Sequence, residues 1–264
     1  MCSLTLVGFG NRTGIKEATL SCTGGTIQVA AHRVLQDFWG TDKALLGVVW
    51  AGEENCVTNK ECLLTICGRS NAVFPAATVT LLKSGSNLTS KAAWQLAVCV
   101  TTGSTITFRK SSFTMIKGAT PLVIHSNSTS VLVEECTIHG NNFTPSFFSY
   151  SSAIRVDNAH LTILSSTVAM NNASSTNQGT VTGAAAAQIN IQNSRFYSNM
   201  ARYGGAIYAK DHAIITIKGS HFERNNASSG GAVYALNQAY VQVLPNGEGE
   251  GACFLPAQRA DSTT

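Results

Sequence analysis

The sequence is short of charge. Asp, Glu, Lys and Arg make up 12% of the 264 residues, and the net charge at pH 7 is only +4. The sequence contains no block of Lys and Arg, which argues against a nucleic-acid partner. Disorder normally accompanies low hydrophobicity and high charge, and 44% hydrophobic residues oppose it. We therefore expect a folded protein that does not bind nucleic acid.

Long apolar runs are also missing. The longest, ALLGVVWAG at 44–52, is far shorter than the roughly 20 residues that a membrane-spanning helix needs. The first residues, MCSLTLVGFGNRTG, have neither the basic start nor the apolar centre of a signal peptide. We expect no transmembrane segment in this chain, and a secretion leader would have to lie outside it.

Cysteine is present eight times, six of them in the first 99 residues. Cys56, Cys62 and Cys67 lie close together, but their spacing is not the CxxC pairing of zinc sites, so disulfides in an oxidising compartment are the better interpretation. Asn-X-Ser/Thr sequons agree with secretion. They begin at Asn11, Asn87, Asn127, Asn142, Asn172 and Asn226. These features predict an extracellular or cell-surface glycoprotein.

Helical periodicity is absent, and a repeat takes its place. FYSNMARYGGAIY (196–208) returns 26 residues later as FERNNASSGGAVY (222–234). A wider template reads apolar, any, apolar, two residues, small, any, apolar, two residues, Asn. Its copies begin at Val79, Ile106, Val131, Leu161, Ile189, Ile215 and Val241. The chain is therefore a repeat protein with a drifting period of 25 to 30 residues.

The template has the period of a strand with one buried face, and a unit of this kind must stack on its neighbours. We therefore predict an all-β fold, a right-handed single-stranded parallel β-helix of about six coils over 76–244. The cysteine-rich segment 1–75 is expected to be a cap or small domain, with a short helix at 30–38. Residues 245–264 are expected to be irregular or disordered, unless the repeat is truncated here, which would argue for a longer natural chain.

The repeat assigns roles to its residues. An inward ladder of asparagines is predicted at the bend between two strands, since Asn tolerates a left-handed bend and its amide can bond to the amide one coil away. Its members are Asn141, Asn171, Asn199 and Asn225. Tyr208 and Tyr234 should stack, and the paired glycines beginning at Gly204 and Gly230 should form turns. Arg109 and Lys110 should pair with Glu134 and Glu135 of the next coil.

The combination of FxxN (FYSN, FERN) with GGA[IV] (GGAI, GGAV) resembles the repeat of the chlamydial polymorphic outer-membrane proteins. Similar motifs occur in other right-handed β-helix proteins of the pectin-lyase-like class. The two full copies cover 196–233, and degenerate copies extend the resemblance back to about residue 106. It implies a right-handed β-helix and says little about activity.

The resemblance implies a candidate polysaccharide substrate, because many proteins of this architecture cleave or bind acidic polysaccharides, and the aspartates are the candidate catalytic residues. Only Asp157 and Asp211 occur between 79 and 244, each four residues before a copy of the template. This spacing predicts that the two aspartates occupy the same position in their coils, two coils and about 10 Å apart. This distance is near the separation of the two carboxyl groups in inverting glycosidases, roughly 6.5–9.5 Å. Arg155 shares a strand face with Asp157, and His212 follows Asp211. These four residues define a catalytic hypothesis, that of a polysaccharide lyase or hydrolase.

Turn preference explains the same column of Asn and Asp, because Asn127 and Asn237 share its phase. His139 and His221 lie in other phases and are expected at the surface. We therefore favour a non-catalytic extracellular scaffold or adhesion module, without cofactor or metal. Its predicted partners are polysaccharides, other surface glycans and proteins.

Overall fold

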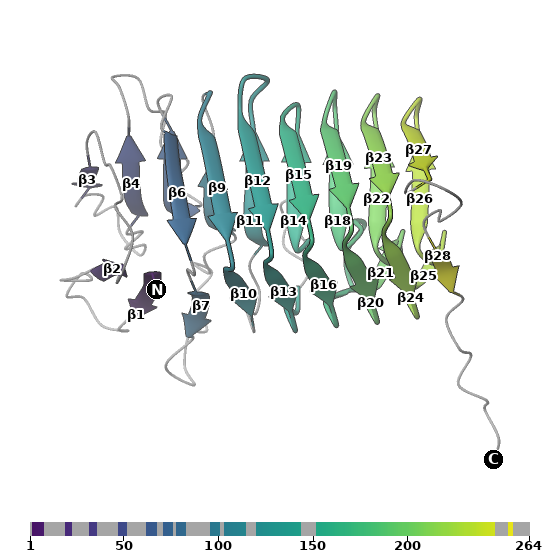
Figure 1. Cartoon of the computed structure of the whole chain (residues 1–264), viewed down its shortest axis with the longest axis horizontal. Helices are drawn as coiled ribbons and strands as arrows, with labels where there is room; N and C mark the ends of the chain where they lie inside the picture. The colour runs from purple at the N-terminus through teal and green to yellow at the C-terminus, as the bar shows by residue number, and fades with distance from the viewer. Residues whose placement is uncertain are drawn as a thin grey trace, which may run out of the picture.

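The protein is described by a computed structural model that covers 103–114, 120–143, 152–245 and 253–255, together with the strands that precede residue 103. Its strands lie side by side in a stack that runs from the N-terminal to the C-terminal end of the chain (Figure 1). Except for the pairs β1–β2 and β3–β4, all neighbouring strands are parallel. The described residues contain no helix, and so no helix that could cross a membrane. The predicted parallel β-helix is confirmed.

Four sheets run along the stack. Sheet A contains β1 (Cys2–Val7), β2 (Thr19–Cys22), β7 (Thr78–Leu82), β10 (Ser112–Thr114), β13 (Thr137–His139), β16 (Thr167–Ala169), β20 (Arg195–Tyr197), β24 (His221–Glu223) and β28 (Cys253–Leu255). Sheet B contains β3 (His32–Leu35), β4 (Gly47–Ala51), β5 (Cys62–Cys67), β8 (Leu96–Val100), β11 (Thr120–His125), β14 (Ile154–Asp157), β18 (Val181–Ala184), β22 (Ile207–Lys210) and β26 (Val233–Leu236).

The other two sheets are narrower. Sheet C contains β6 (Asn71–Pro75), β9 (Thr105–Arg109), β12 (Ser130–Glu134), β15 (His160–Leu164), β19 (Gln188–Gln192), β23 (Ile214–Lys218) and β27 (Tyr240–Leu244). Sheet D contains β17 (Asn172–Ala173), β21 (Met200–Tyr203) and β25 (Asn226–Ser229). Each complete coil visits the sheets in the order C, A, D, B.

The core is made of columns of identical or similar side chains. Ile215 and Ile217 of β23 lie beside Ile189 and Ile191 of β19, as the template predicts. In sheet A the inward column ends in three phenylalanines, with Phe196 and Phe222 stacked at 4.9 Å and Phe222 and Phe254 at 4.7 Å between ring centroids. Alternate residues of β9, β12, β15, β19 and β23 in sheet C are buried. This period of two is the pattern read from the sequence.

Three segments contain strands that the sequence did not predict. The helix predicted over 30–38 is wrong for its centre, where β3 pairs antiparallel with β4 as a strand, because pairing with a neighbour overrides a weak local helical pattern. Strand β28 lies within the segment predicted to be irregular and pairs in parallel register with β24. Strands β4, β5 and β6 lie within the predicted cap, yet β4 pairs in parallel with β5, β5 with β8 and β6 with β9.

The bends repeat as regularly as the strands. Between sheets C and A each bend holds one left-handed residue, with φ near 50° at Lys110, Glu135, Ser165, Asn193 and Gly219. The bend between A and D repeats this at Gly140, Met170, Ser198 and Arg224. A left-handed conformation costs a residue with a Cβ roughly 1–2 kcal/mol. Most of these bends place a residue with a Cβ in the left-handed conformation, so other contacts of the bend must offset its cost.

Candidate functional site

The predicted asparagine positions form a continuous ladder between sheets A and D. The side-chain amide of Asn141 donates from Nδ2 to Oδ1 of Asn171 at 2.8 Å, Asn171 to Asn199 at 3.0 Å, and Asn199 to Asn225 at 3.0 Å. Each Nδ2 also donates to a carbonyl of the preceding coil, as from Asn225 to Phe196 O at 2.9 Å. All four side chains are buried. The ladder therefore satisfies the amides in the interior of the bend.

A second ladder, absent from the sequence predictions, runs along the bend between sheets C and A. The amide N–H of Ser166 donates to Ser194 Oγ, and that of Ser194 to Ser220 Oγ, both at 3.1 Å. Each hydroxyl also lies within hydrogen-bond distance of the carbonyl oxygen two residues earlier, 2.8 Å from Ser166 to Leu164. The sequence template requires a small residue at this position. A small residue alone does not predict that its side chain accepts a hydrogen bond from the neighbouring coil.

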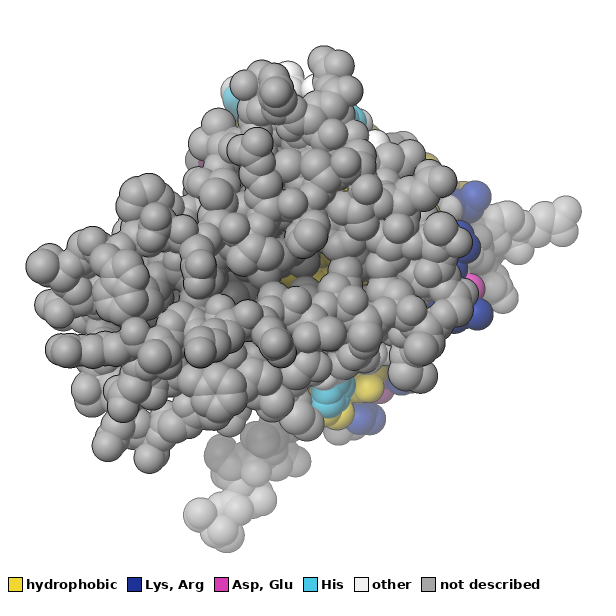
Figure 2. Space-filling view, turned by 90° about the vertical axis from the view of Figure 1, so that its left-hand side faces the viewer, with side chains coloured by type: hydrophobic (Ala, Val, Ile, Leu, Met, Phe, Trp, Pro, Cys, Tyr) yellow, Lys and Arg dark blue, Asp and Glu magenta, His cyan; other side chains and the backbone are white. Residues whose placement is uncertain are grey.

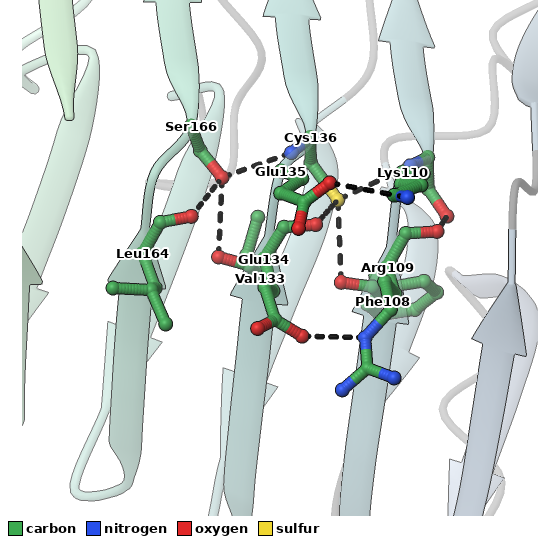
Figure 3. Close-up of polar contacts among 10 residues, drawn as sticks. Phe108, Arg109, Lys110, Val133, Glu134, Glu135, Cys136, Leu164 and Ser166 are labelled. Atoms are coloured by element: carbon green, nitrogen blue, oxygen red, sulfur yellow. Dashed lines mark hydrogen bonds and ion pairs between the residues drawn. The ribbon is translucent and has the colours of Figure 1, made fainter. Parts of the chain in front are cut away.

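Cys136 occupies the serine position in its coil (Figure 3). The amide of Ser111 donates to its sulfur at 3.3 Å, and the amide of Cys136 donates to Ser166 Oγ at 2.9 Å. Its thiol lies 3.2 Å from the carbonyl oxygens of both Phe108 and Glu134. Burial raises the pKa of this thiol, so it stays protonated and serves as a ladder residue. Cys136 and Cys253 are free, whereas Cys99 is disulfide-bonded.

The predicted ion pairs are present on the outside of the same bend (Figure 3). Arg109 Nε contacts Glu134 Oε2, and Lys110 Nζ lies 3.5 Å from Glu135 Oε2. Viewed from the N-terminal end of the stack, basic side chains with an acidic one among them line one edge of the described part (Figure 2). Exposed pairs of this kind contribute under about 1 kcal/mol each. These ion pairs match opposite charges on neighbouring coils at the surface and do not form a functional site.

The outer face of sheet B is the exception to the pattern of one buried face. All four residues of β14 and of β18 are buried, so these strands are covered on both sides. One outward row crosses the sheet at a single register. Its members are Val123, Arg155, Thr182, Tyr208 and Tyr234. This row is the best candidate for a functional surface.

The cover comes from the connection between sheets D and B. In the coil of β17 and β18 this connection spans 174–180, and its Gln178 Oε1 accepts from an Arg155 Nη atom at 3.0 Å. A Cβ at Gly179 would lie 2.7 Å from the Tyr208 Cβ, so this segment packs directly on the tyrosine. The next two coils have only 204–206 and 230–232 here. The cover therefore ends near Tyr208, and Tyr234 is only partly buried.

Three tyrosines meet where the cover ends. Tyr208 and Tyr234 stack with ring centroids 5.9 Å apart, which confirms the predicted pair. Tyr203, at the end of β21, joins them at 5.7 Å from Tyr208 and 5.4 Å from Tyr234. Arg202 lies over the Tyr203 ring at 5.5 Å. We call Tyr203, Tyr208 and Tyr234 the tyrosine cluster. Tyr203 could not be placed from the sequence, because its phase in the repeat carries no distinctive pattern.

The predicted glycine turns bring the cluster together. Gly204 has a φ of +55°, and a Cβ there would lie 1.8 Å from Ile207 O. A Cβ at Gly205 would lie only 2.2 Å from Gly231 O. Neither distance is compatible with a side chain. Only glycine allows the short connection between Tyr203 and Tyr208.

Asp157 lies within the row but is closed off by its neighbour. Arg155 donates from Nε and a terminal nitrogen to both carboxylate oxygens of Asp157, at 2.7 and 2.9 Å. The side chains are only 8% and 12% exposed. A bidentate pair under a cover leaves neither carboxylate oxygen open to another partner. Asp157 is therefore poorly placed to exchange a proton with a substrate.

Asp211 lies in a different environment. Its side chain is 43% exposed, accepts a hydrogen bond from Asn237 Nδ2 at 3.0 Å and lies 3.4 Å from Lys210 Nζ. The bond from Asn237 and the charge of Lys210 lower the pKa of Asp211. His212 follows it as an exposed residue with a φ of 68°. Burial and the charge of Asp211 raise the pKa of Tyr208.

The predicted common phase of the two aspartates is wrong. Asp157 pairs with Ala184 at the end of a strand, whereas Asp211 follows the strand β22 in the turn, where it meets Asn237. The coil of Asp157 reaches sheet C through a turn one residue shorter, so counting back from sheet C misplaces it by one position. Asn127, predicted in the same phase, lies two residues past His125, the register partner of Asp157.

The remaining predicted residues lie elsewhere. Asn142, Asn172 and Asn226 lie on the outside of sheet D, and Asn127 lies on the exposed turn between β11 and β12. Asn11 and Asn87 lie outside the described residues. His139 and His221 lie in sheet A, away from sheet B. In the described part of the chain, His, Cys, Asp and Glu nowhere form a group of three that could hold a metal ion.

Comparison with known proteins supports the fold. A family model described as the right-handed β-helix region matches residues 81–246. No curated protein and no solved structure gives a significant match to the chain. The matched segment contains the ladders, the tyrosine cluster and both aspartates, and it covers more than half of the sequence. The chain belongs to the right-handed β-helix family.

Proposed function

We propose that the protein is a non-catalytic extracellular β-helix that acts as a cell-surface or matrix scaffold and binds glycans on the outer face of sheet B. The tyrosine cluster is the observation that carries this proposal. Tyr203 and Tyr234 are partly exposed, and Arg202 and Asp211 flank the rings. Tyrosine offers an apolar ring face with a polar tip, which suits sugars that present C–H faces and hydroxyl groups.

The setting of the two carboxylates supports a binding role over hydrolysis. A glycosidase needs one carboxylic acid whose pKa is raised, so that it can protonate the leaving group. The pKa of Asp211 is lowered instead, and Asp157 is held by both of its oxygens in the pair with Arg155. Neither setting favours the general acid that a hydrolase using Asp157 and Asp211 would need.

The sequence adds support for a surface location. Sequons, together with repeats that resemble those of the chlamydial surface proteins, are typical of a chain that works outside the cytoplasm. The stack itself offers a long, rigid surface of parallel strands, on which a partner can contact several coils at once.

The test is binding to defined polymers, among them pectin and polygalacturonate, measured by retention on immobilised polymer. We expect Tyr203→Ala and Tyr234→Ala each to weaken binding roughly tenfold, equivalent to about 1.4 kcal/mol. Tyr197→Ala is the matched control, because Tyr197 is a partly exposed tyrosine of sheet A that also faces an arginine, Arg195, at 4.9 Å.

Equal losses in all three variants would place binding outside the tyrosine cluster. Catalysis is tested on the same polymers by release of unsaturated or reducing ends. A release that disappears in Asp211→Ala would replace the scaffold proposal by the enzyme.

A further inference from the structure

Three sequons share a single row of sheet D. Asn142 forms a parallel bridge with Asn172, Asn172 pairs with Met200, and Met200 pairs with Asn226. The three acceptor asparagines therefore occupy one register position, and Met200 takes that position in the coil without a sequon. We call this row, Asn142, Asn172, Met200 and Asn226, the acceptor row. Neighbouring members are separated by one strand spacing, about 4.8 Å.

The ladder and the strands orient each sequon. The asparagine before each acceptor is buried in the ladder with its amide bonded, so it cannot carry a substituent. The middle residue of each sequon faces inward, with Phe143 2% and Ala173 0% exposed. Alternation then turns the acceptor asparagine outward, and Asn142 and Asn226 are exposed. Ser174 donates to Asn172 Oδ1 from its amide and hydroxyl, which leaves the Nδ2 of Asn172 without those contacts.

A second observation points to something that covers this edge. Met200 is 43% exposed between Asn172 and Asn226, and Met170, two residues before Asn172, is 51% exposed. Met170 lies in the bend between sheets A and D, and its sulfur is 3.2 Å from His139 Nε2, so only Met200 belongs to the acceptor row. Met200 is therefore an exposed apolar side chain between two sequon asparagines.

We propose that the acceptor row carries N-linked glycans, and that these glycans cover Met200. This inference rests on the extracellular location in the proposed function. In the modification, Nδ2 of the asparagine bonds to the anomeric carbon of a lipid-diphosphate-linked oligosaccharide. The bond between that carbon and the diphosphate oxygen breaks, and one amide proton leaves with the lipid diphosphate. The bulky, hydrophilic product suits an exposed edge.

The row also divides the surface of the stack. Sheet D lies between sheets A and B in each coil, so glycans on the acceptor row stand along the border of sheet B without occupying the row of Tyr208. Tyr208 and Tyr234 of sheet B lie outside the acceptor row, whereas Tyr203 lies at the far end of β21 from Met200. The modified edge and the binding face are therefore compatible within one molecule.

The experiment directs the full chain through the secretory pathway of a eukaryotic cell. Enzymatic release of N-glycans in heavy-oxygen water then marks each occupied asparagine as a labelled aspartate in peptide mass spectra. We expect the label at Asn226 and at Asn142 or Asn172, and none at Asn199 or Asn225 of the ladder. Absence of label from all three acceptors would overturn the proposal.

The cover is tested by oxidation of methionine with dilute peroxide. We expect Met200 to be oxidised severalfold more slowly in the glycosylated protein than after glycan removal, and Asn226→Gln and Asn172→Gln each to restore part of the faster rate. Asn127→Gln is the control, because Asn127 belongs to a sequon on the turn between β11 and β12. Equal oxidation rates with and without glycans would show that the glycans do not cover Met200.

The result is separable from the proposed function. Binding through the tyrosine cluster can be measured on chain made without glycosylation, so failure of the acceptor row leaves that measurement intact. Failure of polymer binding in turn leaves the labelled asparagines unaffected.

Discussion

Each coil has a constant half and a variable half. From the first inward residue of sheet C to the ladder asparagine the distance is ten residues in four successive coils, Val131 to Asn141, Leu161 to Asn171, Ile189 to Asn199 and Ile215 to Asn225. The distance from each ladder asparagine to the first inward residue of sheet C in the next coil is 20, 18, 16 and 16 residues, and the last of these ends at Val241. The constant half holds both ladders, and the variable half holds the sheet B surface.

The difference shows how the stack separates stability from function. A ladder side chain must meet its counterpart one strand spacing away, so an inserted residue in the constant half would break every bond above and below it. The connection between sheets D and B has no such constraint and can lengthen into a cover or shorten into a glycine turn. The length of the coil therefore varies in the connections that border the outer face of sheet B.

The largest effect is expected in the variable half, at the buried ion pair. Arg155→Ala leaves the carboxylate of Asp157 under its cover without a counter-ion, and breaking a buried pair in this way costs about 3–5 kcal/mol. The free energy of unfolding from denaturant titration measures it. Arg109→Ala, which removes an exposed pair, is the control and should cost under about 1 kcal/mol. Equal losses would mean that the cover does not exclude water.

The next effect breaks the asparagine ladder. Asn199→Ala removes the acceptor of Asn171 and the donor to Asn225 and should cost about 1–3 kcal/mol through unsatisfied buried groups. Asn226→Ala changes the exposed neighbour in the same doublet and should be close to neutral. Thermal unfolding of both variants distinguishes them. Similar shifts in Tm would contradict the division of labour within the doublet.

A smaller effect is expected in the serine ladder. Ser194→Ala removes the hydroxyl that accepts from the amide of Ser166 and should cost about 1–2 kcal/mol. Ser194→Cys should cost less, because Cys136 fills the same position in its own coil through a sulfur acceptor. Denaturant titration of the pair gives the ranking. A cysteine variant less stable than the alanine variant would show that the sulfur at Cys136 is tolerated only locally.

The smallest effect is expected in a bend of the constant half, where a substitution should stabilise the protein. Ser198 has a φ of 53° in the bend between sheets A and D, so Ser198→Gly removes the left-handed cost and should stabilise by up to about 1 kcal/mol. Thr216→Gly in strand β23 should destabilise by about the same amount, because the extended backbone there has no need of glycine. A loss of stability in both variants would show that entropy outweighs the conformational cost at this bend.

The sequence predicted the constant half well and the variable half poorly. The inward columns, the asparagine ladder and the pairing of Arg109 with Glu134 follow from a fixed ten-residue spacing. The relative position of Asp157 and Asp211 does not, because it depends on a turn that is one residue shorter in one coil. Periodicity carries no information on such a difference, nor on the fold of 174–180 over Tyr208.

The amides of the asparagine ladder all point the same way. Each side-chain bond of the ladder runs from an Nδ2 to the Oδ1 of the following coil, from Asn141 to Asn171, Asn171 to Asn199 and Asn199 to Asn225. Aligned dipoles polarise one another, so the row strengthens with its length. The stack therefore has a polarity along its axis, with a donor-facing and an acceptor-facing end. A further coil continues the row only in the head-to-tail sense, since two stacks joined at like ends would set donor against donor or acceptor against acceptor.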